Sequence, residues 1–339
     1  MTGLAEERLA RALARITRGL DRQTYGGLEQ LGENAIDARL AELAKTGKRY
    51  CFSISTTYAD TLGADGANLN RTVRPGRWWV EQIRRHFPQS VLLKGLEGDT
   101  VLILTWKPGP AGKLLIGHER RLASLARHMD RWRAKKERKR LGRNVGLAEA
   151  DLFALLTGKR VALVGNAASL AETSHGADID DHDLVIRCNR APIVHARSHG
   201  TRTDWIATSM DFPERLLAAK GASHVLWMSP RRERMPLWLV AFPRLFLNPP
   251  EHPARLATLT GARPSTGLMA VDLLRRSPAA EIRLYGFDFF SSNTTSSDRT
   301  KQNAPHDFDA EQQLVLRWAA EDQRLRIIAS AGASRAPAG

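Results

Sequence analysis

The chain has 339 residues, of which 42% are hydrophobic and 26% charged, and its 51 Lys and Arg residues outnumber its 36 Asp and Glu residues, giving a net charge of +15. These proportions allow a packed core and exclude intrinsically disordered, collagen-like and disulfide-scaffold proteins. Residues 1–150 hold 28 basic and 16 acidic side chains, against 23 and 20 in residues 151–339. The length predicts two domains, and most of the positive charge belongs to the first half.

Two cysteines, Cys51 and Cys188, are too few for a disulfide framework or a zinc cluster. Solitary thiols are typical of a reducing compartment. Residues 1–20 carry charges throughout and do not resemble a signal peptide, and no uncharged apolar run reaches about 18 residues. We therefore expect a soluble, cytoplasmic protein, which lies at the inner membrane if a basic segment of the chain binds lipid there.

The first half of the chain shows mixed patterns. Residues 3–46 have helical spacing of apolar side chains. Short β-prone runs at 50–54 and 101–105 flank a helical pattern at 77–87. We predict that residues 1–118 begin with helix, continue as a small α/β or α+β unit, and have an unknown role.

Residues 119–143 are the most polar stretch, with eleven basic and three acidic residues. Leu122, Leu125, Met129 and Trp132 recur there at helical spacing, which predicts a helix with one packed face and one face rich in Lys and Arg. Such a helix either links two domains or binds an acidic surface, whether anionic lipid, lipopolysaccharide or nucleic acid. No nucleic-acid motif accompanies it, so nucleic acid is not the expected partner.

The pattern changes after Gly158, where apolar runs alternate with helical segments. The apolar runs lie at 160–164, 184–187, 205–208, 225–228, 282–285 and 325–328, and the helical segments include 267–276 and 310–320. This alternation predicts an open, mostly parallel α/β sheet flanked by helices. Ligands of such sheets bind beyond the carboxyl ends of the strands, so the loops after Val164, Arg187 and Tyr285 should line one crevice.

The first two of these loops contain asparagines. Gly165 and Asn166 follow a predicted strand, and a turn of small residues there lets backbone N–H groups approach a phosphate. The same pair is also an ordinary tight turn. Asn189 follows the next strand, where its amide either donates to a ligand oxygen or caps the turn.

Three later positions carry polar groups or glycine at the ends of predicted elements. Ser265, Thr266 and Gly267 precede a helix, where hydroxyl groups hydrogen-bond a phosphate or cap the helix. Gly286 ends a strand. His306 opens the last helix beside acidic residues, where it is either a structural histidine or an exposed acid or base.

In their order along the chain and in their residues, these segments resemble the motifs of glycosyltransferase family 29, the sialyltransferases. VALVGNAASL, IDDHDLVIRCNRAP and GTRTD resemble the large sialyl motif, and PSTGLMAVDLL with EIRLYGFD resembles the small one. His306 and Glu311, with four residues between them, resemble the very small motif. The resemblance spans about residues 158–328.

The resemblance implies a GT-A-like, modified Rossmann-type domain that transfers an acidic sugar from a CMP-activated donor. The transfer would invert the anomeric centre and need no metal or other cofactor. The resemblance implies donor (CMP) binding by Asn166, Asn189, Ser265, Thr266, Gly267 and Gly286, a general base at His306, and supporting positions at Gly165 and Glu311.

The sequence departs from the family pattern in two places. The positions of a disulfide in animal sialyltransferases are Val161 and Ala279 here, and the His-Tyr-rich third motif is missing from residues 291–303. The donor is therefore open between sialic acid and a related ulosonic acid such as Kdo. Acidic strings at 178–183 and 307–309 also leave open a metal-dependent transferase that uses another nucleotide sugar.

The predicted organisation is an N-terminal region at 1–118, a basic helical linker at 119–150, a sialyltransferase-like catalytic domain at 151–330 and a flexible tail at 331–339. The predicted partners are a CMP-activated sugar, a glycan or glycolipid acceptor belonging to a surface polysaccharide under construction, and an anionic membrane surface. The non-enzymatic alternative is a basic protein with a degenerate nucleotide-binding fold that binds an anionic surface or nucleic acid through residues 119–143.

Overall fold

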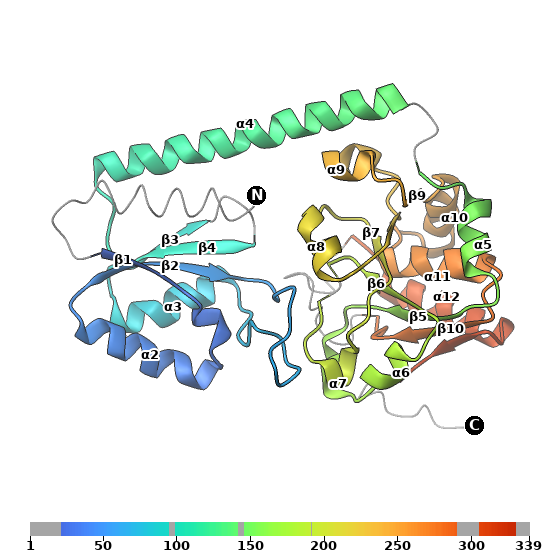
Figure 1. The fold of residues 1–339 in the computed structure, drawn as a ribbon, viewed down its shortest axis with the longest axis horizontal. Helices are drawn as coiled ribbons and strands as arrows, with labels where there is room; N and C mark the ends of the chain where they lie inside the picture. Colours follow the sequence, from blue (N-terminus) through green and yellow to red (C-terminus); the bar gives the residue numbers. More distant parts are fainter. Residues whose placement is uncertain (1–21, 95–98, 142–145, 191, 290–304, 330–339) are drawn as a thin grey trace. The chain divides into compact units, whose positions relative to one another are not determined.

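The computed structural model describes residues 22–94, 99–141, 146–190, 192–289 and 305–329. The chain divides into two compact units, the first formed by Met1–Gly63 and Ala67–Met129 and the second by Ala64–Gly66 and Asp130–Gly339. Figure 1 shows the helices and strands of each unit. Each unit has its own sheet and its own core.

The first unit contains a four-stranded sheet in the order β1-β2-β4-β3. Its elements are β1 (Arg22–Gly26), η1 (Leu28–Gln30), α2 (Glu33–Lys45), β2 (Arg49–Ser55), α3 (Gly76–His86), β3 (Val91–Lys94) and β4 (Thr100–Leu104). Strands β1 and β2 are parallel, and β4 runs antiparallel to both β2 and β3. Helix α2 buries Ile36 and Leu40, and α3 buries Trp79 and Ile83, in one core with side chains of β2.

The predicted helix over residues 3–46 is wrong at residues 22–26, which form β1. This short segment pairs with β2 over its full length, from Arg22 opposite Arg49 to Gly26 opposite Ser53. Pairing with a neighbouring strand outweighs local propensity here, as tertiary context often does. From Glu33 to Lys45 the segment is helical, and residues 3–21 lie outside the described residues.

Helix α4 (Pro110–Leu141) begins in the first unit and ends in the second. The predicted packing of Leu122, Leu125, Met129 and Trp132 is wrong, because these side chains are between 40% and 63% exposed. A different face of the helix is buried, and small side chains such as Ala134 on that face allow close contact. No described helix is both long enough and apolar enough to cross a bilayer.

The second unit contains a seven-stranded sheet in the order β11-β10-β5-β6-β7-β8-β9. The strands are β5 (Arg160–Val164), β6 (Leu184–Cys188), β7 (Trp205–Thr208), β8 (His224–Trp227), β9 (Leu245–Leu247), β10 (Glu281–Tyr285) and β11 (Leu325–Ile327). All the pairs between these strands are parallel. The predicted α/β class with a mostly parallel sheet flanked by helices is confirmed.

Alternate residues of each strand face opposite sides of the sheet. Both sides carry buried apolar side chains, and helices cover both. The helices are α5 (Glu149–Leu156), η2 (Ala168–Glu172), α6 (Gly176–Asp180), α7 (Ala196–His199), α8 (Glu214–Ala219), η3 (Arg232–Arg234), α9 (Leu237–Val240), α10 (Glu251–Thr260), α11 (Thr266–Arg276) and α12 (Phe308–Glu321). Helices α5, α10, α11 and α12 share one core with the sheet. Helices η2 and α6 contribute to a second cluster, and α8 and α9 contribute to a third.

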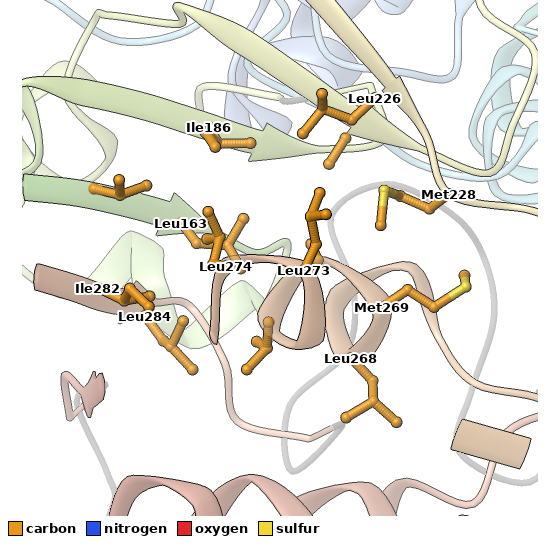
Figure 2. Packing of buried hydrophobic residues seen from close by; sticks show 14 of the residues in the cluster. Leu163, Ile186, Leu226, Met228, Leu268, Met269, Leu273, Leu274, Ile282 and Leu284 are labelled. Carbon is orange, nitrogen blue, oxygen red and sulfur yellow. The ribbon is translucent and has the colours of Figure 1, made fainter. Parts of the chain in front are cut away.

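Helix α11 is the most deeply buried of these helices. Its residues 268–274 are all buried, and Figure 2 shows Leu273 and Leu274 beside strand residues that include Leu163 and Ile186. All of these residues except Asp272 are apolar, and Asp272 pairs with Arg255 at 2.5 Å, so the helix belongs in a core. Because α11 is fixed in this way, the position of its N-terminus is fixed too.

The strand order reverses between β5 and β10. Strands β6 to β9 extend from one side of β5, and β10 and β11 extend from the other. Gly165 N donates to Tyr285 O at 2.8 Å, and a Cβ atom on Gly165 would lie 2.5 Å from Gly286 O. Gly286 has a φ of 66°, which favours glycine. Two backbones therefore meet closely at the switch point, where ligands of open α/β sheets bind.

We predict that Gly165→Ala lowers the free energy of unfolding of the second unit by about 1–3 kcal/mol, because the new methyl group overlaps backbone rather than a movable side chain. Urea unfolding followed by circular dichroism measures the change. Gly117→Ala in α4 is the control, since its Cβ would meet nothing within 4 Å. Equal stability of Gly165→Ala and the parent chain would contradict the close approach.

Candidate functional site

The loops after β5 and β6 are joined by an asparagine side chain. Asn166 Nδ2 donates to the carbonyl oxygen of Cys188 at 3.1 Å. Strand β6 extends to Cys188, so Arg187 belongs to the strand and not to the loop. The two predicted asparagines, Asn166 and Asn189, thus follow neighbouring strands at the carboxyl edge of the sheet.

Asn189 combines two unfavourable features. Its φ of 57° lies in the left-handed region, which costs energy for a residue other than glycine. Its side-chain Oδ1 is buried and has no hydrogen-bond partner among the described residues, which also costs stability. Its backbone N–H donates to Ala207 O at 2.8 Å and holds the residue in place. Strain and an unsatisfied acceptor at one position are typical of a binding site.

The start of helix α11 is held by a buried carboxylate. Ser265 is the N-cap residue, and its Oγ accepts a hydrogen bond from Leu268 N at 3.1 Å. Ser265 N donates to one oxygen of Glu311 at 2.7 Å, and Ser265 Oγ donates to the other at 2.6 Å. Glu311, in the first turn of α12, is only 2% exposed. Burial raises the pKa of Glu311 to about 7, although both hydrogen bonds from Ser265 oppose the shift.

The next two residues join α11 to the loops at the edge of the sheet. Thr266 Oγ1 donates to Ser209 Oγ, which follows β7, at 2.9 Å. A Cβ atom on Gly267 would lie 2.9 Å from the ring of Phe287, which follows Gly286. The positive end of the helix dipole and its first N–H groups therefore lie beside the carboxyl ends of β7 and β10. That arrangement suits an anion.

His306 lies next to the same segment. Its Nδ1 lies 2.7 Å from the carbonyl oxygen of Arg263, two residues before Ser265. A carbonyl oxygen only accepts, so Nδ1 carries a proton in this contact and Nε2 is the basic nitrogen of the neutral ring. The ring centroid is 5.4 Å from that of Phe308, and the residue is half-buried. A histidine held in this tautomer suits a general base.

The contacts thus place the predicted residues in two groups. The first contains Gly165, Asn166, Asn189 and Gly286, and the second contains Ser265, Thr266, Gly267, His306 and Glu311. The contact between Gly267 and Phe287 connects the second group to the strand that ends at Gly286. Sequence reasoning did not single out Ser209 or Phe287, because neither stands out within its local pattern.

The acidic strings that suggested a metal have structural roles. Both carboxylate oxygens of Asp180 accept from Thr201 N, and Oδ1 also accepts from Arg202 N. Asp178 accepts from the Tyr285 hydroxyl and pairs with a neighbouring arginine. Asp307 Oδ1 caps α12 by accepting from Ala310 N at 2.9 Å. In the described part of the chain, no three His, Cys, Asp or Glu residues are grouped as a metal site requires.

The sequence of the second unit matches a known family. Residues 147–242 match the sequence model of glycosyltransferase family 29 (sialyltransferase). This segment is therefore similar to that family. It contains Gly165, Asn166 and Asn189, whereas the predicted residues from Ser265 onward lie beyond the matched range. The resemblance inferred from the motifs is confirmed.

Curated sialyltransferases are similar to part of this chain. A mouse CMP-N-acetylneuraminate-beta-galactosamide-alpha-2,3-sialyltransferase 1 is 34% identical over 87 residues, which cover 22% of this chain and 26% of the mouse protein. The human protein of the same name is 32% identical over 87 residues, with coverages of 22% and 26%. The chain spans about a quarter of the length of the curated relatives it matches.

Solved structures of sialyltransferases are also similar. A mammalian sialyltransferase in complex with Gal-beta-1-3GalNAc-ortho-nitrophenol has 20% identity and a TM-score of 0.40, and the match covers 57% of this chain and 78% of that one. The Campylobacter jejuni sialyltransferase CstII with CMP-3FNeuAc has 15% identity and a TM-score of 0.37, with coverages of 52% and 83%.

The structure describes one of the two departures from the family pattern, the positions of the missing disulfide, and does not describe the other, the missing third motif. Val161 and Ala279 are buried in the same core as α11, at 0% and 2% exposure. Apolar packing occupies these positions. Both cysteines of the chain are free, and Cys188 is buried in this same core while Cys51 is buried in the first unit. Residues 291–303 and the predicted tail at 331–339 lie outside the described residues.

We predict that Glu311 makes the stability of the second unit depend on pH. The pKa of Glu311 is about 7 in the folded chain and about 4.3 in an unfolded one. Glu311 keeps its proton to a higher pH in the folded chain than in the unfolded one. This contribution to stability is therefore largest below about pH 4 and is lost as the pH rises towards 7. Relative to Glu311→Gln, the parent chain should lose on the order of 3 kcal/mol over that interval.

Urea unfolding of both chains at pH 5 and pH 8 measures this difference. Glu251→Gln, on an exposed residue in the first turn of α10, is the control and should show no such dependence. A difference between the parent chain and Glu311→Gln that stays constant with pH would contradict the raised pKa.

Proposed function

We propose that this chain is an inverting glycosyltransferase that uses a CMP-activated acidic sugar and transfers it to a hydroxyl group of a glycan or glycolipid. The observation that carries the proposal is the segment from Arg263 to Ser265, which contacts His306 at one end and Glu311 at the other while it begins α11. A proton acceptor thereby lies beside a helix N-terminus suited to a phosphate.

The donor's phosphate is proposed to lie at the start of α11. The first N–H groups of the helix are hydrogen-bond donors suited to a phosphate oxygen. The hydroxyls of Ser265 and Thr266 donate to Glu311 and Ser209, so a phosphate would accept from either hydroxyl only in place of that partner. CMP leaves with a single phosphate, so these donors can stabilise the leaving group. We therefore propose that the reaction needs no metal ion.

The nucleotide is proposed to extend from there along the edge of the sheet. Gly286 allows close approach of the strand ends, and the amides of Asn166 and Asn189 are candidates for contact with cytidine. The buried, unpaired Oδ1 of Asn189 is an acceptor that matches an amino group. The sugar of the donor is then proposed to lie on the side of His306.

The transfer is proposed to occur in one displacement. The acceptor oxygen forms a bond to the anomeric carbon as the bond from that carbon to the phosphate oxygen breaks, and the electron pair of that bond leaves with CMP. His306 Nε2 takes the acceptor's proton in the same step. An anomeric carbon of this kind reacts through an oxocarbenium-like transition state, so positioning and one proton transfer account for most of the catalysis.

Sialic acid is the proposed sugar, and Kdo is the competing candidate. The support for sialic acid is the family match over residues 147–242 and the names of the curated relatives, which use CMP-N-acetylneuraminate. The proposed acceptor belongs to a surface polysaccharide under construction. Parallel assays with CMP-N-acetylneuraminate and CMP-Kdo distinguish the two donors.

We predict that Asn189→Gly weakens CMP binding about tenfold while the fold is retained. Glycine adopts the left-handed backbone of this position without strain, so the substitution removes only the amide and its interactions with a ligand. Isothermal titration of the protein with CMP, with EDTA present, measures the dissociation constant. Unchanged CMP affinity in Asn189→Gly would contradict the assignment.

Two controls accompany this experiment. Asn70→Gly, in a loop of the first unit, should leave CMP binding unchanged. UDP and GDP, with and without Mn²⁺, test the alternative nucleotide sugars. Binding of UDP or GDP only in the presence of the metal would favour the metal-dependent transferase.

We predict that His306→Ala lowers kcat by about 100- to 10,000-fold, the usual contribution of a general base. CMP affinity should change by less than about threefold, because His306 is assigned to the acceptor's proton and not to the nucleotide. Release of CMP from the donor in the presence of a galactoside acceptor measures the rate. His252→Ala, on α10, is the matched control and should retain activity. Retained activity in His306→Ala would overturn its role.

A further inference from the structure

Helix α4 has an exposed apolar stripe that the proposed transferase does not use. Four of its residues, 122, 125, 129 and 132, recur at intervals of three and four positions, and residue 114 lies eleven positions before 125. Such intervals place side chains on one face of a helix. The exposed fractions are 76% for Leu114, 40% for Leu122, 60% for Leu125, 52% for Met129 and 63% for Trp132.

A separate face of α4 packs against the protein. Ile116 and Ala134 are 6% and 1% exposed, and Ala123 is partly buried against the cluster of Ile116. These three residues are spaced by seven and eleven positions, about two and three turns. The helix therefore already has a buried face, and the apolar stripe is additional to it.

The charges of α4 are distributed unevenly around the helix. Its three acidic residues, Glu119, Asp130 and Glu137, are spaced by eleven and seven positions and so share one face, which is not that of the stripe. Asp130 pairs with Arg133 at 3.9 Å, and Glu137 pairs with Arg140 at 2.5 Å. The acidic side chains are thus partly neutralised by neighbours on the same helix.

Exposed cations border the stripe instead. Arg121, Lys136 and Lys139 each follow a residue of the stripe by seven positions, so each lies close to its face. The Nζ atom of Lys136 lies 5.5 Å from the centre of a Trp132 ring. An apolar stripe with Trp, Leu and Met, bordered by Lys and Arg, is the pattern of a helix that lies in a membrane interface.

We propose that α4 binds the surface of a bilayer that contains anionic lipid, with the apolar stripe inserted between headgroups and the bordering cations on lipid phosphates. A lipid surface satisfies both parts of this face, since it takes up the apolar side chains and attracts the cations. Nucleic acid would pair with the cations but leave the apolar side chains in water. A second copy would cover the stripe but bring like charges together.

The dimensions of the stripe fit this orientation. From Leu114 to Trp132 it extends about 27 Å along the helix, at 1.5 Å per residue. The helix is too polar to cross the bilayer, so it would lie parallel to the surface. This inference does not depend on the proposed transferase activity.

The test is cosedimentation of the full chain with vesicles of phosphatidylcholine alone or with 30% phosphatidylglycerol. We expect binding to the anionic vesicles that falls as salt is raised, and at least about tenfold weaker partitioning of the double variant Leu125→Ser/Trp132→Ser. The matched control is Leu259→Ser/Leu316→Ser, which removes two leucines of similar exposure, 49% and 45%, from other helices. It should bind as the parent chain does.

A charge series tests the bordering cations. Each of Arg121→Gln, Lys136→Gln and Lys139→Gln should weaken partitioning about fivefold. The control series removes the same charge from exposed lysines outside α4, namely Lys45, Lys107 and Lys159, each changed to Gln. A larger effect of the α4 series supports the proposal. Equal effects of the two series would overturn it, because net charge alone would then account for attraction of the protein to the vesicles.

Depth of insertion gives an independent readout. Lipids brominated on their acyl chains should quench part of the tryptophan fluorescence of the parent chain, and Trp132→Phe should lose that part. Three outcomes overturn the proposal: equal binding to neutral vesicles, self-association in light scattering that Leu125→Ser/Trp132→Ser abolishes, or binding confined to RNA or DNA. Folding of each variant is checked by its circular dichroism spectrum.

Discussion

The contact between Glu311 and Ser265 determines the geometry of the candidate site. It joins residues 46 positions apart and fixes the first turn of α12 to the N-cap residue of α11. Because His306 lies just before α12 and contacts Arg263, the same contact sets where the histidine stands relative to the start of α11. Burial disfavours the charge of Glu311 by more than its two hydrogen bonds favour it, so the pKa of Glu311 is raised.

The sheet supplies the second half of that geometry. Helix α11 is buried on every side, so its N-terminus cannot shift without disturbing the core formed by residues such as Leu268 and Leu274. Gly267 against Phe287, and Gly165 against Gly286, allow the loops beyond the strands to meet without intervening side chains. Rigid elements thus position the loops. Asn189, with its unfavourable backbone and an Oδ1 that has no partner in the described part of the chain, lies at the edge where those loops converge.

Much of this fold could be predicted because its strands are buried on both faces and form continuous apolar runs. Strands β5 and β7 match the predicted ranges, whereas β1 and β9 were not predicted. The segment of β1 lacks an apolar run, and β9 has only three residues after Arg244. The site residues could be named from motif order, but the pairing of Glu311 with Ser265 could not, because no periodicity links residues in separate helices. Ser209 and Phe287 were missed because neither stands out within its local sequence pattern.

The face of helix α4 that its apolar periodicity predicts to be buried differs from the face that is buried in the structure. Periodicity correctly places Leu122, Leu125, Met129 and Trp132 on one face, but it does not say whether that face is covered. The structure packs a different face, whose small or buried side chains include Ile116 and Ala134. An exposed stripe of this kind is unusual in a soluble helix unless something covers it. The separation of the acidic residues from the stripe, which neither composition nor net charge reveals, supports the proposed anionic surface as its partner.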